Sequence, residues 1–134
     1  MAVIFSASTQ LGAPANTSHF FRPLLHWLFP AISEAAFDRL HYTIRKSAHF
    51  VEYGVLGVLI WRLLYRDPAF GLISPRRRFF LALLCCMLYA STDEFHQSFV
   101  PTRQPAVHDV LLDTCGAGVG ALAAWGFRKL RAGV

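Results

Sequence analysis

Acidic side chains interrupt two apolar runs in the second half of the chain. The uncharged run 79–92 is followed directly by Asp93 and Glu94. The next apolar run opens with Asp109 and contains Asp113. An unpaired charge at membrane depth costs about 2.5–3.5 kcal/mol on insertion scales. Charges grouped at such positions therefore imply partners, water or a function.

The composition indicates an integral membrane protein of one domain. Of its 134 residues, 54% are hydrophobic and 16% are charged, whereas soluble domains carry about 25% charged residues. The net charge of +5 does not indicate binding to nucleic acid, because the basic residues gather at 76–78 and 128–131, beside apolar runs. Such flanking clusters are typical of membrane topology.

Three membrane-spanning helices are predicted, at about 48–65, 79–97 and 110–127. The helix that contains the first span is expected to begin after Ser33, a plausible N-cap, and to end at Asp67-Pro68. Residues 33–134 would then form the transmembrane domain, giving an all-α membrane bundle of three transmembrane helices.

Residues 1–32 are expected to form an N-terminal interfacial or truncated helical segment. The apolar start of 1–13 is too short to span a membrane, and 12–18 has the composition of a loop. The aromatic stretch 19–30 is interrupted by Pro23 and is predicted to lie at the membrane interface.

The basic segments set the expected orientation of this multi-pass cell-membrane protein. Loop 66–78 and the C-terminus are predicted to be cytoplasmic, which leaves loop 98–108 extracytoplasmic. Because neighbouring helices run in opposite directions, the polar residues of all three spans reach the same membrane face. We therefore predict a polar pocket at the extracytoplasmic end of the bundle.

The candidate ligand-binding residues come from all three spans and the loop before the last. They are Lys46, His49, Glu52, Tyr53, Asp93, Glu94, Gln97, Arg103, Asp109 and Asp113. In the structural alternative, Lys46 and Arg103 neutralise Asp93 or Glu94, but the carboxylates outnumber these two cations, so pairing alone leaves acidic groups over.

Four of these residues, His49, Glu52, Asp93 and Glu94, are also candidates for acid and base catalysis. Their nitrogen and oxygen atoms suit a divalent metal, but their spacing is not diagnostic of a metal site. We predict no metal and no cofactor.

Several short motifs of this chain, from about residue 33 onward, resemble the VanZ-like family of small membrane proteins. They are Arg45-Lys46-Ser47-Ala48-His49-Phe50-x-Glu52-Tyr53-Gly54-x-Leu56, Thr92-Asp93-Glu94-x-x-Gln97, Pro101-x-Arg103 and Asp109-Val110-x-x-Asp113-Thr114-x-Gly116. The chain departs from the family at Asp113, where many members have Asn. It also lacks the full spanning helix with which members commonly begin.

The resemblance implies a cell-envelope role that affects susceptibility to glycopeptides and lipoglycopeptides of the teicoplanin type. The expected partners are the lipid bilayer and a lipid-linked envelope precursor or a lipoglycopeptide. In this hypothesis Lys46 and Arg103 hold an anionic headgroup, and the carboxylates set its charge selectivity. Two alternatives remain: a membrane-embedded enzyme acting on a lipid-linked headgroup, and a structural helper subunit of an envelope complex.

Overall fold

The computed structural model describes residues 14–99 and 106–133, and these form helices and no strand. In chain order the elements are α2 (Pro14–Leu28), α3 (Glu34–Arg66), the short 3-10 helix η2 (Pro68–Phe70), α4 (Pro75–Gln97) and α5 (Val107–Ala132). The all-α prediction is confirmed for these residues, and each of the three predicted spans lies within one long helix.

Local capping interactions fix the ends of α3. The Ser33 hydroxyl accepts a hydrogen bond from the backbone N–H of Ala36 (3.3 Å), as expected of an N-cap. At the other end, Asp67 is the C-cap of α3, and its carboxylate accepts the N–H of Ala69 (2.9 Å) to start η2. Both predicted boundaries of this helix are therefore confirmed.

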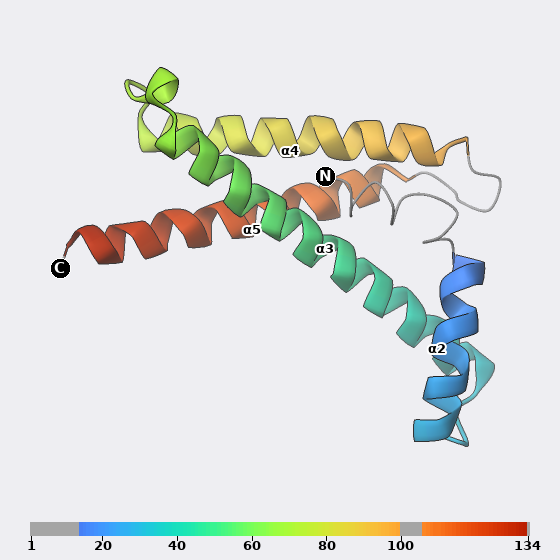
Figure 1. Ribbon diagram of the computed structural model, residues 1–134. Helices are drawn as coiled ribbons and strands as arrows, with labels where there is room; N and C mark the ends of the chain where they lie inside the picture. The colour runs from blue at the N-terminus through green and yellow to red at the C-terminus, as the bar shows by residue number, and fades with distance from the viewer. Residues whose placement is uncertain (1–13, 100–105, 134) are drawn as a thin grey trace.

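The helices α3 and α5 cross near their middles, and α4 runs beside α5 (Figure 1). At the crossing the two backbones touch without intervening side chains: a Cβ on Gly116 would overlap the carbonyl oxygen of Phe50, and a Cβ on Gly57 would overlap that of Ala117. Small residues allow such close approach between helices in membranes. The glycines of both helices therefore allow the close packing at the crossing.

Two helices in the described part of the chain, α3 and α5, are long and apolar enough to cross a membrane. In α4 the apolar run 79–92 lies between Arg76–Arg78 and Asp93, and at 1.5 Å per residue it covers only about 21 Å of a hydrocarbon core about 30 Å thick. Length and composition therefore support a membrane span for α3 and α5. A third span in α4 remains a prediction.

The outer faces of the bundle carry exposed apolar side chains at helical spacing. On α3 the exposed side chains are Val51, Val55, Leu59 and Leu63; on α4 they are Phe80, Leu84 and Leu88; on α5 they include Leu111, Val119 and Leu122. Soluble proteins rarely expose contiguous apolar surface of this extent. These faces are compatible with a surrounding lipid phase, and α4 shares the feature with its two neighbours.

The segment before α3 differs from its prediction. Helix α2 begins at Pro14, inside the stretch expected to be a loop, and it continues through Pro23. Proline fits the first turn of a helix because that turn has no partner for its N–H groups. Contacts with α3 hold the helix past Pro23: Arg22 pairs with Glu34 (3.0 Å), and the His26 ring stacks on Phe37. Residues 1–13 lie outside the described part of the chain.

Candidate functional site

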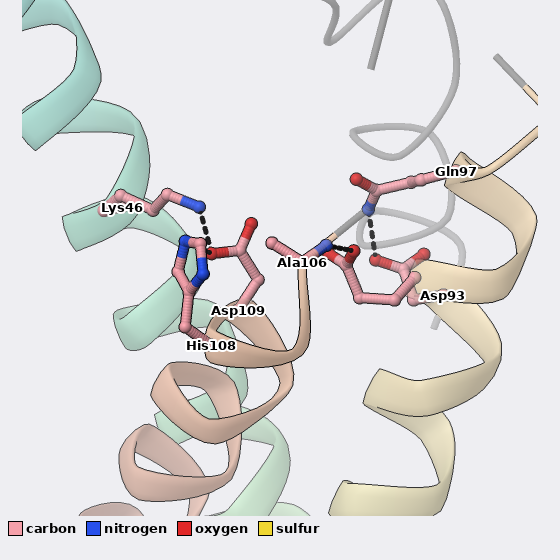
Figure 2. A network of polar contacts seen from close by, with 7 residues as sticks. Lys46, Asp93, Gln97, Ala106, His108 and Asp109 are labelled. Atoms are coloured by element: carbon pink, nitrogen blue, oxygen red, sulfur yellow. Dashed lines mark hydrogen bonds and ion pairs between the residues drawn. The ribbon is translucent and has the colours of Figure 1, made fainter. Parts of the chain in front are cut away.

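Polar side chains from three helices gather where α4 ends and α5 begins (Figure 2). We call this group the polar cluster, and it consists of Lys46, Glu52 and Tyr53 on α3, Asp93, Glu94 and Gln97 on α4, and Asp109 and Asp113 on α5. The predicted convergence of the three spans is therefore present in the structure. The side of the membrane on which the cluster lies remains a prediction.

Lys46 connects α3 to the first turn of α5. Its Nζ forms an ion pair with Oδ1 of Asp109, and Nε2 of His108 lies 3.1 Å from the same oxygen (Figure 2). The structural alternative paired Lys46 with Asp93 or Glu94. In the structure its ion pair is with Asp109, in the first turn of α5, and its charge also acts on Glu94. The pair is largely shielded from solvent, with 24% and 19% of the two side chains exposed.

The carboxylates of α4 are held by hydrogen bonds. Nε2 of Gln97 donates to Oδ2 of Asp93 (2.9 Å), four residues earlier on the same buried face. Oε2 of Glu94 accepts the backbone N–H of Ala106 (3.0 Å). Ala106 is the N-cap of α5 and has no side chain that could accept a hydrogen bond. Glu94 thus brings a negative charge to the positive end of the α5 dipole, where it is stabilising.

Two further carboxyl groups of the cluster are buried or half-buried. Asp113 is buried, and the charges of Asp93, Glu94 and Asp109 act on it. Glu52 is half-buried and lies within the influence of Asp93. Carboxylates therefore face one another here, and within residues 14–99 and 106–133 neither Glu52 nor Asp113 forms an ion pair with a cation.

Tyr53 lies at the centre of the bundle, with none of its side chain exposed. Its ring contacts Tyr89 on α4, with 6.2 Å between the ring centroids. Its hydroxyl is buried and makes no hydrogen bond to any described residue, although the charges of Asp93 and Asp113 act on it. Buried hydroxyl groups normally have a hydrogen-bond partner, so this hydroxyl is an exception to that rule.

Two predicted site residues, His49 and Arg103, are not among the contacts described above. His49 is half-buried on α3, and Arg103 lies outside the described residues. In the described part of the chain, no three histidine, cysteine, aspartate or glutamate side chains are placed to hold a metal ion together.

Sequence reasoning did not assign roles to His108 or Ala106. His108 has no distinctive spacing in the sequence, yet its Nε2 lies 3.1 Å from Oδ1 of Asp109. Ala106 contributes a backbone group, for which its side chain gives no signal. The sequence indicates this contact only indirectly: α5 begins without a capping side chain, and an acidic residue, Glu94, precedes the end of α4.

What the polar cluster offers chemically is a set of hydrogen-bonding carboxyl groups that outnumber the cation paired with them. Its carboxylates are Glu52, Asp93, Glu94, Asp109 and Asp113, and Lys46 is the cation paired with them in the described residues. Such a site suits a group that brings donors or positive charge into a partly apolar setting.

Comparison with known proteins agrees with the motifs. The chain matches the VanZ/LLP1 family over residues 1–128, so the match includes the segment before α3 as well as all three long helices. No curated protein and no solved structure matches the chain. The match covers nearly the whole sequence, and the chain therefore belongs to the VanZ/LLP1 family.

Proposed function

We propose that this protein acts in the cell envelope by binding an amphiphilic envelope component or lipoglycopeptide in the polar cluster, and that this binding lowers susceptibility to antibiotics of the teicoplanin type. The family is generally linked to glycopeptide resistance. The observation that carries the proposal is the gathering of carboxylates from α3, α4 and α5 at one end of a bundle with an apolar exterior.

The chemistry of the cluster supports a ligand with a mixed headgroup. Its carboxylates would accept hydrogen bonds from ammonium, amide or hydroxyl groups, and Lys46 would meet an anionic group by exchanging part of its contact with Asp109. An acyl chain of the same ligand would lie against the exposed apolar faces of the helices, where it replaces bilayer lipid at little cost.

The proposal further places α3, α4 and α5 across the membrane, with the polar cluster on the extracytoplasmic side. For α4 this requires Asp93 and Glu94 to lie at the edge of the hydrocarbon region of the membrane. The hydrogen bonds with Gln97 and Ala106 support that placement, because they satisfy part of each carboxylate inside the protein.

Antibiotic susceptibility tests the proposal directly. A sensitive Gram-positive host would express the wild-type chain, Glu94→Gln or Glu34→Gln, with equal membrane levels verified by blotting. Glu94→Gln removes the charge but keeps an oxygen that can accept the Ala106 N–H. Glu34→Gln is the matched control, because Glu34 is exposed, lies outside the cluster and, as Gln, keeps an oxygen that can accept from Arg22. We expect the wild type and the control to raise tolerance to teicoplanin and Glu94→Gln to lose the effect.

The same variants separate binding from a purely structural role. In the structural alternative the cluster only joins helices, so Glu94→Gln would lower the melting temperature and the membrane level together. Loss of tolerance at unchanged melting temperature supports a functional pocket. If the wild type leaves both teicoplanin and vancomycin susceptibility unchanged at good expression, the proposed role is wrong for that host.

A further inference from the structure

A cavity lies at the end of the bundle opposite to the polar cluster. Beyond their crossing, α3 and α5 diverge towards their C-termini (Figure 1), and a cavity of about 590 Å³ is lined by residues of both helices there. Sites for small molecules typically measure about 300–1,000 Å³. Four arginines line this cavity: Arg62 and Arg66 from α3, and Arg128 and Arg131 from α5.

The four arginines outnumber the acidic residues near them, among which Asp67 lies beside Arg62 and Arg66. In the part of the chain that the structure describes, none of the four forms an ion pair. The neighbouring carboxylate of Asp67 accepts the N–H of Ala69 instead. Arginines that converge on one cavity without acidic partners are suited to bind phosphate, which their planar guanidinium groups grip through two N–H bonds.

Aromatic side chains hold part of this arginine group in place. The guanidinium of Arg128 lies 3.5 Å from the centroid of the Tyr65 ring, and Tyr65 in turn stacks on Trp61. Stacking occupies the flat face of a guanidinium and leaves the N–H groups at its edge available. Arg128 is thereby positioned before any ligand arrives, which reduces the entropy lost on binding.

Apolar side chains form the rest of the cavity wall. They include Val58 and Trp61 on α3 and Ala124 and Phe127 on α5. A cavity that is basic at its rim and apolar along its wall matches the two parts of a phospholipid. Free phosphate would contact only the arginines. An acidic peptide would also leave the apolar wall without a matching partner.

We infer that this cavity binds one anionic phospholipid from the surrounding membrane, with the lipid phosphate between the arginines and an acyl chain in the space between α3 and α5. The inference is independent of any ligand at the polar cluster, which lies at the other end of the helices. A juxtamembrane basic residue contributes about 1 kcal/mol to attraction by anionic lipids, equivalent to about a fivefold change in affinity.

Native mass spectrometry of the delipidated, detergent-purified full chain tests the inference. Dioleoyl phosphatidylglycerol would be titrated against dioleoyl phosphatidylcholine, which has the same acyl chains without net charge. The test variant is Arg62→Gln/Arg66→Gln. The control, Arg76→Gln/Arg77→Gln, removes the same charge from the same end of the bundle at residues that do not line the cavity. All four side chains are exposed, and none donates a hydrogen bond to a described residue.

We expect the wild type to prefer phosphatidylglycerol and the test variant to bind it about 25-fold more weakly, two arginines each contributing about fivefold. The control should retain the preference. Equal loss in both variants would overturn the inference in favour of unspecific attraction to a basic surface. Equal binding of the two lipids would also overturn it, and displacement of the lipid by inorganic phosphate would indicate a phosphate site instead.

Discussion

Gly120 on α5 lies so close to Gly54 on α3 that a Cβ on Gly120 would overlap the carbonyl oxygen of Gly54. The obstacle is backbone, which cannot rotate away as a side chain does. The crossing of the two helices therefore depends on the hydrogen atom at Gly120, and any larger group there must push the helices apart.

Gly120→Ala should destabilise the bundle by at least about 1–3 kcal/mol, the usual cost of overpacking. Gly126→Ala on the same helix is the control, because a Cβ there meets nothing within 4 Å. Thermal unfolding of both variants in one detergent measures the difference. Equal melting temperatures would contradict the close contact between α3 and α5.

Lys46→Met should lower the free energy of unfolding by about 1–3 kcal/mol, because it removes the lysine paired with Asp109, which lies among other carboxylates. Asp109→Asn should cost less, since it removes one of the repelling charges. Adding Asp109→Asn to Lys46→Met should restore most of the stability. A double-mutant cycle checks this, and strictly additive effects would show that the pair does not couple α3 to α5.

Tyr53→Phe should leave the melting temperature unchanged or raise it, because the hydroxyl is buried without a hydrogen bond to a described residue. Removing such a group relieves a desolvation penalty of about 1–3 kcal/mol. Tyr42→Phe, at an exposed position of the same helix, provides the comparison. A clear drop for Tyr53→Phe alone would show that the hydroxyl is hydrogen-bonded in the native protein.

The contact between α2 and the start of α3 should weaken in acid. His41 lies before the predicted span 48–65, and its ring stacks on Phe37 and contacts Phe21. Burial lowers the pKa of His41 below its usual 6.5, Arg45 lowers it further, and Asp38 opposes the shift. From α2, the His26 ring stacks on Phe37, and the guanidinium of Arg22 lies 5.0 Å from the centroid of the Phe37 ring.

Because the pKa of His41 is lower in the folded state than in the unfolded state, the unfolded state takes up a proton at a higher pH. The full contribution to stability is present above about pH 6.5 and is lost as the pH falls from there through the folded pKa. Melting temperatures should therefore fall between about pH 7.5 and about pH 5.5 in the wild type and fall less in His41→Phe. His19→Phe, an exposed change on α2, should behave as the wild type; the same slope in all three would exclude His41 as the cause.

Local signals in the sequence predicted the helix boundaries well. Ser33 and Asp67-Pro68 act within one turn of the chain, so their effect does not depend on the fold. The passage of α2 through Pro23 was not predictable in this way, because contacts with α3, distant in sequence, compensate for the lost hydrogen bond.

The sequence predicted which polar residues come together in the cluster, but not which of them form pairs. Alternating helix directions bring Lys46 and the carboxylates to one end, whereas the choice of Asp109 as partner depends on where α5 crosses α3. That crossing point is set by glycine contacts at atomic distance, which residue spacing does not specify. The arginine-lined cavity has the same origin, since α3 and α5 diverge only beyond those glycines.

The separation of the polar cluster from the four cavity arginines gives the molecule an electric dipole along its helices, acidic at one end and basic at the other. A membrane potential acts on such a dipole with about 2.3 kcal/mol per elementary charge for each 100 mV. Inverting the bundle would move the arginines one way across that field and the carboxylates the other way, so both changes add. With an interior-negative potential, the orientation with the arginines inside would be lower in energy, and this is the same orientation that the basic segments of the sequence predict.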